Sequence, residues 1–431
     1  MAAERTARFR ALTPTQAAEL AERTRYRVIG SLLVLLGIAA TILFARNIDP
    51  SLVSTFGMNT GGASAAIQLP DLVLPSFLTV VAVSGLSVLL GAFQLLRGFG
   101  KWSSAVLGAG ILLFVFSFLV WATRDQSINL ASMLKSTLQR ATPIAIGALA
   151  GVLAERAGVV NIAIEGLMLA SALVAVIVAS LGHNIWLGLS AAVLTGALLA
   201  LFHGILSIRY RVDQIISGMV INIFAAGMTS FISAKFLEPF QFLNQPGTFP
   251  NLSLPVLSSI PFFGGVIFEN NLFVFAMLVL VVAVQIALFH TRWGLRTRIV
   301  GEHPKAADTL GIDVYRMRYL AVILSGICAG FAGAYFTLGS VGRFDRLMTS
   351  GRGFISLAAM IFGNWTPSGA FGASVIFGFA DSLQGKLAIL NVPIASSFLL
   401  MAPYIATMIA LAGLVGRATP PAADGQPYEK Q

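Results

Sequence analysis

The 431-residue sequence is poor in charge, cysteine and histidine, and these shortages exclude several classes of protein. Only 11% of its residues are charged, whereas soluble globular domains carry about 25%. The single cysteine, Cys328, can form no internal disulfide, and the four histidines have no spacing typical of a metal site. We therefore expect neither a disulfide framework nor a bound metal in this chain.

The sequence also lacks a phosphate-binding loop of the GxxxxGK[ST] type. Gly100-Lys101 and Gly385-Lys386 have neither the upstream glycine nor the serine or threonine that the motif requires. No Ser/His/Asp or Cys/His grouping indicates hydrolysis. We therefore expect that the chain is not an enzyme and holds no cofactor of its own.

The sequence consists mainly of long apolar segments. Hydrophobic residues make up 57% of the chain, and about 12 segments are apolar, most of them near the ~20 residues that a helix needs to cross a bilayer. The segment 354–363 is too short to cross alone, so it is expected to be broken or re-entrant. The sequence predicts an all-α polytopic membrane protein with segments near 28–45, 72–96, 103–123, 137–154, 160–181, 185–208, 214–234, 272–290, 319–340, 354–363, 370–388 and 393–415.

The formal charge of +10 comes from basic residues in short loops between these segments. Such loops face the cytoplasm, so the charge reflects topology and no nucleic-acid partner is expected. The pattern predicts four parts: a basic cytoplasmic segment 1–27, a three-helix extension 28–125, a transmembrane core 130–416 and a cytoplasmic tail 417–431. Both termini are then cytoplasmic.

The core contains a pattern typical of an internal repeat. A Gly-x-x-x-Gly pair at 147–151 precedes the segment 161–169, and a second pair at 326–330 precedes 353–364. In the predicted topology the first glycine-rich helix runs inward and the second runs outward. Inverted-topology repeats of this kind hold their substrate at the interface of the two halves.

Three polar residues lie in apolar stretches of the core. Asn161 and Glu165 are four residues apart, so a helix through both would present them on one face. Such residues at membrane depth are costly and usually face a cavity or a partner. An alternative for Glu165 is an ion pair with Arg156, and an alternative for Asn222 is an interhelical hydrogen bond.

The short segment contributes further candidates for a substrate path. Phe354 and Phe362 offer aromatic faces on which a flat heteroaromatic ligand could stack, and Asn364 offers an amide. Together with Asn161, Glu165 and Asn222 they form the predicted path.

The basic loop 291–318 holds a short helix with its own stop signals. Pro304 suits the first helical position and Gly311 suits the left-handed residue that ends a helix. The helix either solvates the loop or docks a partner protein. The candidate docking residues are Glu302, Pro304, Ala306, Ala307, Asp308 and Gly311.

Four stretches resemble the permeases of the branched-chain amino acid/ribose ABC importer superfamily, and in particular its nucleoside (simple-sugar-type) permeases. They are ERAGVVNIAIEGLML (155–169), QIISGMVIN (214–222), GEHPKAADTLGI (301–312) and GRGFISLAAMIFGNWTPSGA (351–370). The resemblance implies a multi-pass protein of the plasma membrane that imports nucleosides. It also implies three partners besides membrane lipid: an ATP-binding subunit with two nucleotide-binding domains that carries ATP and Mg, a second homologous permease subunit and an extracytoplasmic substrate-binding lipoprotein.

Two other functions remain open at this point. An ion-driven secondary transporter could use Glu165 as its proton or sodium carrier, because broken helices and inverted repeats occur in such proteins too. A simple-sugar ABC permease is the second alternative. The helix at 304–310 favours an ABC permease, because a secondary transporter has no ATPase to dock.

Overall fold

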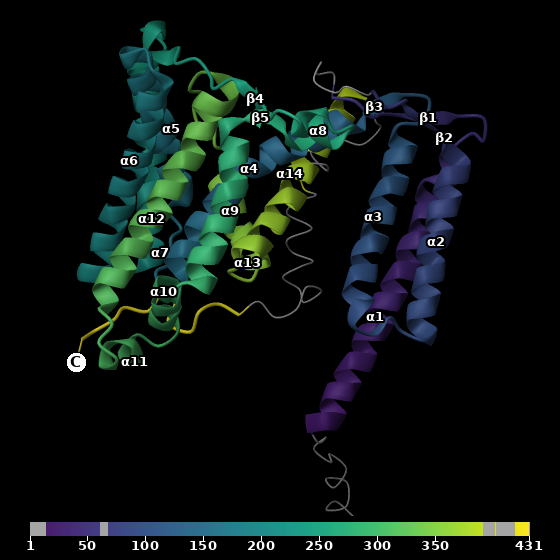
Figure 1. Ribbon diagram of the computed structural model, residues 1–431, viewed down its shortest axis with the longest axis horizontal. Coiled ribbons are helices and arrows are strands. Elements are labelled where there is room, and N and C mark those ends of the chain that lie inside the picture. Colours follow the sequence, from purple (N-terminus) through teal and green to yellow (C-terminus); the bar gives the residue numbers. More distant parts are fainter. Residues whose placement is uncertain (1–13, 61–67, 391–400, 402–418, 431) are drawn as a thin grey trace, which may run out of the picture. The chain divides into compact units, whose positions relative to one another are not determined.

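The computed structural model describes residues 14–60, 68–390, 401 and 419–430. These residues form a predominantly helical protein that also has two small sheets, as Figure 1 shows. Nine helices of the described part are long and apolar enough to cross a membrane, which confirms the predicted fold class. Apart from Met401, the predicted segment 393–415 lies outside the described residues, as do residues 1–13.

The chain divides into two compact units that meet in sequence near residue 130. In the first unit, β1 pairs antiparallel with β2 and parallel with β3, and this sheet joins the helix ends. Its elements are α1 (Pro14–Leu43), β1 (Val53–Gly57), β2 (Leu72–Pro75), α2 (Ser76–Leu96), α3 (Ser103–Ala122) and β3 (Ser127–Asn129).

The second unit holds the remaining elements and every residue of the predicted path. Its helices are α4 (Leu130–Glu155), α5 (Ile164–Gly182), α6 (Ile185–Gly204), α7 (Gln214–Ile232), α8 (Phe263–Ile267), α9 (Leu272–His290), α10 (Arg292–Glu302), α11 (Pro304–Thr309), α12 (Val314–Ala334), α13 (Arg352–Phe362) and α14 (Pro367–Ile389). Its strands are β4 (Asn251–Ser253) and β5 (Glu269–Asn271), which pair antiparallel.

Small polar side chains determine where several of these helices begin. The Asp213 carboxylate accepts hydrogen bonds from the first amides of α7, and Asp313 does the same for α12. Asn271 caps α9 and Thr291 caps α10 in the same way. Each cap satisfies a backbone donor that a helix end leaves without an intrahelical partner.

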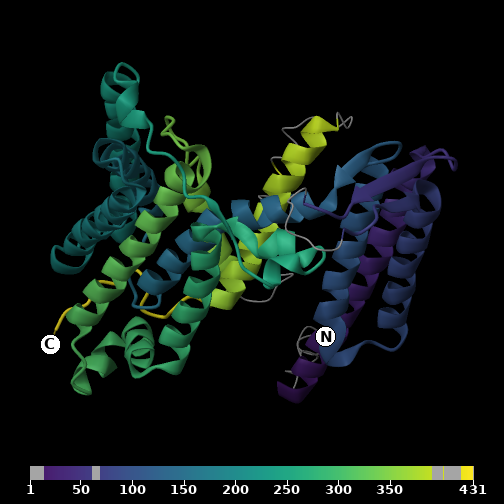
Figure 2. The ribbon, with the colours of Figure 1, turned by 45° about the horizontal axis from the view of Figure 1, so that its top comes forward.

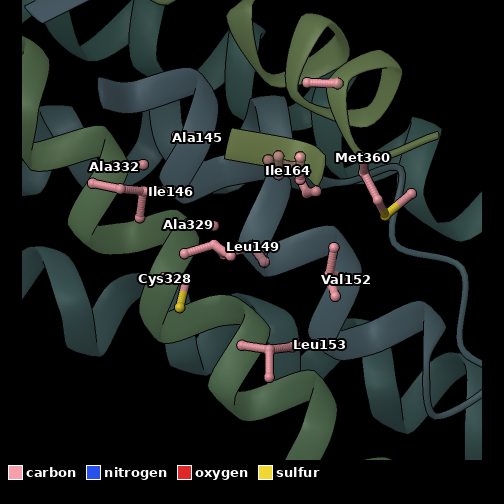
Figure 3. Packing of buried hydrophobic residues seen from close by; sticks show 14 of the residues in the cluster. Ala145, Ile146, Leu149, Val152, Leu153, Ile164, Cys328, Ala329, Ala332 and Met360 are labelled. Carbon is pink, nitrogen blue, oxygen red and sulfur yellow. The ribbon is translucent and has the colours of Figure 1, made fainter. Parts of the chain in front are cut away.

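The core of the second unit forms where α4 packs against α12. Figure 3 shows Ile146 of α4 next to Ala332 of α12, and Leu149 of α4 next to Ala329, and all four side chains are buried. Branched side chains of α4 thus pack against small residues of α12, and small residues at helix contacts are typical of packing in lipid.

Helix α13 is the broken segment that the sequence predicts. It has 11 residues, so at 1.5 Å per residue it is only about 16 Å long and cannot cross a bilayer. A turn at Gly363–Thr366 separates it from α14, which returns along α4 (Figure 2). Non-helical backbone at membrane depth is tolerated where it lies against protein or lines a cavity. Thr349 and Gly353 are buried at the start of α13, and Gly363 and Trp365 are buried at its end, whereas Phe354 and Asn364 are exposed.

Helices α6 and α12 cross through a contact made of glycines. A Cβ atom added at Gly196 would lie 2.7 Å from the Cα of Gly330 and closer still to the carbonyl oxygen of Gly326. Both obstacles are backbone atoms, which cannot rotate away. The crossing therefore depends on the absence of a side chain at Gly196.

We expect Gly196→Ala to lower the thermal unfolding temperature of the purified protein in detergent, because overpacking a close contact costs about 1–3 kcal/mol. Gly227→Ala on α7 is the matched control, since a Cβ there has no atom within 4 Å. That variant should unfold at or above the temperature of the unaltered protein. Equal unfolding temperatures for the two variants would contradict the packing argument.

Candidate functional site

The carboxylate of Glu165, in the first turn of α5, holds the beginning of α13. Its Oε1 accepts hydrogen bonds from Thr349 Oγ1 at 2.6 Å and from the Gly351 amide at 2.8 Å. Its Oε2 accepts a third from the Gly353 amide at 2.6 Å. Gly351 precedes α13 with a φ of 78°, a conformation that favours glycine. A negative charge at this helix end also interacts favourably with the helix dipole.

The predicted alternative, an ion pair between Glu165 and Arg156, is wrong. Arg156 Nε donates to the carbonyl of Trp365 at 2.8 Å, and its Nη2 donates to the carbonyl of Asn364 at 3.2 Å. Its guanidinium also lies over the Phe289 ring, 5.5 Å from the centroid. Arg156 therefore caps the backbone at the far end of α13, and Glu165 caps its start.

Asn161 does not share a helix face with Glu165, so that part of the prediction is wrong. Helix α5 begins only at Ile164, and Asn161 lies in the turn before it, fully buried. Its Nδ2 donates to Ser325 Oγ of α12 at 2.9 Å, and its Oδ1 accepts from the Ala163 amide at 3.1 Å. The amide ties this turn to α12, and a role of Asn161 in the substrate path stays a prediction.

Asn222 forms the interhelical contact that its position in α7 predicted as the alternative. Its Oδ1 accepts from the Gly166 amide at 2.7 Å and its Nδ2 donates to the Ile162 carbonyl at 2.8 Å. It therefore caps the start of α5, one residue from Glu165. The starts of α5 and α13 are both capped by side chains from other elements.

A cavity of about 340 Å³ adjoins these two helix starts. Glu165, Asn222 and Phe354 all line it, so the structure brings together three of the six predicted path residues. The rest of its wall is mainly apolar and includes Met219 and Ile223 of α7. A few polar groups in an apolar wall are typical of small-molecule sites, and so is a volume above about 300 Å³.

A second cavity, of about 490 Å³, lies on the other side of the segment 345–354. Met348 and Arg352 of this segment face the second cavity, whereas Leu347, Ser350 and Phe354 face the first. The segment is therefore a wall between two cavities, and Glu165 holds that wall in place.

Charged groups concentrate at the second cavity. Asp381 of α14 forms ion pairs with Arg140 at 2.9 Å and with Arg352 at 3.2 Å, which leaves one positive charge in excess within this group. Arg352 also lies over Phe336, 5.8 Å from the ring centroid.

The other two predicted path residues lie at the opposite end of α13. Phe362 packs against Phe377 at 6.3 Å between ring centroids, and it lines neither cavity. Asn364 adopts a φ of 53°, and its Oδ1 accepts from the Thr419 amide at 3.1 Å. The helix length separates them from Glu165.

The loop between α9 and α12 contains α10 and α11, two short helices at one end of the unit (Figure 1). Helix α11 begins at Pro304, and Gly311 follows it with a φ of 77°. Of the alanine pair, Ala306 is exposed, whereas Ala307 is fully buried against Val300 and Val314. Only Ala306 can therefore meet a partner directly, and Ala307 packs α11 onto the unit.

Sequence reasoning did not identify the groups that bind the Glu165 carboxylate. Thr349, Gly351 and Gly353 lie 184, 186 and 188 residues further along the chain. The spacing of the two glycines around Arg352 is the one local signal, because glycine lets a backbone approach closely. A Cβ at Gly353 would lie 2.5 Å from the backbone nitrogen of Glu165.

Comparison with known proteins assigns the chain to a family. A family model described as branched-chain amino acid transport system / permease component matches residues 133–411. The guanosine ABC transporter permease protein NupQ of Bacillus subtilis is 42% identical over 310 residues, which cover 70% of this chain and 97% of that protein. No solved structure matches the chain.

Two more relatives cover somewhat less of the chain. The nucleoside ABC transporter permease protein NupC of Lactococcus lactis subsp. cremoris is 40% identical over 300 residues, which are 67% of this chain and 94% of that protein. A putative glucose ABC transporter permease protein, TsgC13 of Haloferax volcanii, is 34% identical over 258 residues, which are 59% and 77% of the two chains. The chain therefore belongs to the family of branched-chain amino acid transport system permease components, as a multi-pass permease subunit of an ABC transporter.

Proposed function

We propose that this chain is the translocating subunit of an importer for nucleosides, driven by ATP hydrolysis on a partner subunit. The observation that carries the proposal is the cavity in which Glu165, Asn222 and Phe354 meet. Two relatives are named for guanosine and nucleoside transport, which supports the same substrate class.

The chemistry of the cavity fits an uncharged polar ligand with a flat ring. The amides of Gly166, Gly351 and Gly353 already donate to side-chain oxygens, so these helix-start donors are not free to bind an anion. The exposed ring of Phe354 offers a stacking surface for a nucleobase, and Ser350 offers a hydroxyl for the ribose. A sugar without a base would leave the aromatic surface unused.

The rival function is ion-driven transport with Glu165 as the carrier. Three hydrogen bonds of 2.6–2.8 Å hold the Glu165 carboxylate, and two of the donors are backbone amides that do not titrate. A carrier group must instead exchange its proton or cation with both sides of the membrane. The contacts of Glu165 therefore favour a structural role at a gate, and with it an ATP-driven mechanism.

We also propose three partner proteins and an orientation in the membrane for this chain. The exposed face of α11, with Ala306 and Leu310, would dock an ATP-binding subunit with two nucleotide-binding domains, which carries ATP and Mg. Ile223 and Phe224 expose the apolar face of α7 beside the first cavity, where a second permease subunit would close it. A substrate-binding lipoprotein would deliver the ligand from outside the plasma membrane, and both termini would be cytoplasmic.

The deciding experiment measures uptake in proteoliposomes that hold the complete complex, with ATP and ion gradients varied separately. We expect nucleoside uptake with ATP and no gradient. Uptake driven by a gradient without ATP would overturn the assignment. Uptake of glucose in preference to nucleosides would instead identify a sugar permease.

Glu165→Gln should reduce nucleoside uptake about tenfold or more while leaving it dependent on ATP. The amide offers only one acceptor oxygen for three donors, so at least one charge-assisted hydrogen bond is lost, at a cost of about 1.5–3 kcal/mol. Glu238→Gln is the control, because that side chain is exposed and forms a surface ion pair with Arg346. Unchanged uptake by the Glu165 variant would refute the role of the carboxylate.

The two phenylalanines should separate function from stability. Phe354→Ala should lower uptake at least several-fold, since base–aromatic stacking is worth about 1–3 kcal/mol, and leave the unfolding temperature nearly unchanged. Phe362→Ala should instead lower the unfolding temperature, because its ring packs against Phe377. Thermal unfolding and initial uptake rates, measured on the same preparations, test both; the reverse pattern would place the ligand elsewhere.

Ala306→Arg should abolish uptake and weaken binding of the ATPase subunit, because a bulky cation on the exposed face of α11 prevents close approach. The protein itself should remain folded, since Ala306 is solvent-exposed. Ala306→Ser is the conservative control and should bind the ATPase normally. Co-purification of the two subunits provides the measurement, and full retention of the ATPase by the arginine variant would exclude docking at this position.

A further inference from the structure

The C-terminal segment, residues 419–430, has no helix or strand, yet it lies along the second unit beside α10 and α11 (Figure 1). Pro421, Ala423 and Tyr428 are buried although most of their neighbours in the segment are exposed. The alternation indicates an extended chain that is anchored at intervals. The anchors fall into two groups.

The first group holds the loop that contains α10 and α11. The Ala423 amide donates to the Gly301 carbonyl at 2.9 Å, and the Ala422 amide donates to Glu302 Oε2 at 3.0 Å. Tyr428 packs into the cluster that contains Ala307 and its side chain is hydrogen-bonded to Asp308. Two of the predicted docking residues, Glu302 and Asp308, therefore bind the chain's own C-terminal segment.

The start of α12 adds to this group. Tyr315 Oη donates to the Tyr428 carbonyl at 3.3 Å, and the two rings lie 5.5 Å apart. Arg318, which is 1% exposed, donates through Nη1 to the Gln426 carbonyl at 3.0 Å. Burial of Tyr428 and its hydrogen bond to Asp308 raise the pKa of the tyrosine to about 12.

The second group reaches the turn at the end of α13. The Thr419 amide donates to Asn364 Oδ1 at 3.1 Å. The Asp424 carboxyl lies next to that of Glu155, whose Oε2 accepts from Trp365 Nε1 at 2.6 Å. Burial raises the pKa of Asp424 to about 6.

We infer that residues 419–430 act as a clasp that couples movement of α10 and α11 to the position of α13, and thereby to the wall between the two cavities. Asn364 and Trp365 lie at one end of α13, and Glu165 holds the other end at the first cavity. A short rigid helix transmits displacement from end to end, whereas an unstructured connector would absorb it. The inference rests on the proposed function, because it assumes an ATPase that moves α11.

The test uses the complete complex in proteoliposomes, with nucleoside uptake and ATP hydrolysis measured together. A chain that ends after residue 418 should still assemble, should hydrolyse ATP, and should lose at least about nine-tenths of its uptake per ATP. The matched control ends after Glu429 and lacks only Lys430 and Gln431, so it keeps every anchor described above. Uptake per ATP equal to that of the control would overturn the clasp.

A milder variant covers the case in which the deletion does not assemble. Tyr428→Phe keeps the packing and removes only the hydrogen bond to Asp308, and it should lower uptake per ATP several-fold while assembly stays intact. An assembled Tyr428→Phe complex with full uptake per ATP would overturn the clasp as well.

A double variant tests whether the clasp acts through α13. If both ends control one helix, Tyr428→Phe combined with Glu165→Gln should reduce uptake less than the product of the two separate effects. Effects that simply multiply would refute coupling through α13. Failure of the unaltered complex to import nucleosides with ATP would count against the proposed function and would be visible before any variant is compared.

Discussion

The second unit depends on one carboxylate placed where two helices begin. A short helix inside a membrane protein leaves backbone amides without intrahelical partners, and each amide left unsatisfied there is costly. Glu165 satisfies two amides and a hydroxyl before and within the first turn of α13. The same three hydrogen bonds stabilise the charge of Glu165. The free-energy cost of burying this carboxylate and the cost of leaving the amides of α13 unpaired are therefore offset by one set of contacts.

Close packing of small residues makes this arrangement possible. The backbones of α6 and α12 approach one another through glycine, and Gly147 and Gly151 of α4 leave room for Ser356 and Met360 of α13. Asn222 then reaches the start of α5 directly, and a side chain at Gly166 would collide with it. The polar contacts of the site thus require glycine at the points of closest approach.

Helix α13 also joins two regions of the second unit. One end of α13 borders the cavities, and the other end meets Arg156, Glu155 and the C-terminal segment. In the proposed importer, a change at the loop that holds α10 and α11 must be linked to a change at the first cavity, and this structure offers a contiguous physical connection between the two. The wall of residues 345–354 is the part that such a movement would displace.

The sequence by itself determined the helices, because apolar runs of about 20 residues leave few other structures open in a membrane. It also identified the short segment at 354–363 and the short helix in the loop that contains α11. Glu165 and Asn222 stood out because polar side chains at membrane depth need a partner or a cavity. Only the tertiary structure decided what those residues touch. Glu165 and Thr349 are 184 residues apart, and α5 begins after Asn161. Ala307 faces inward, in a cluster that includes Tyr428, 121 positions along the chain. Hydrogen bonds between distant segments follow from packing, which local pattern does not encode.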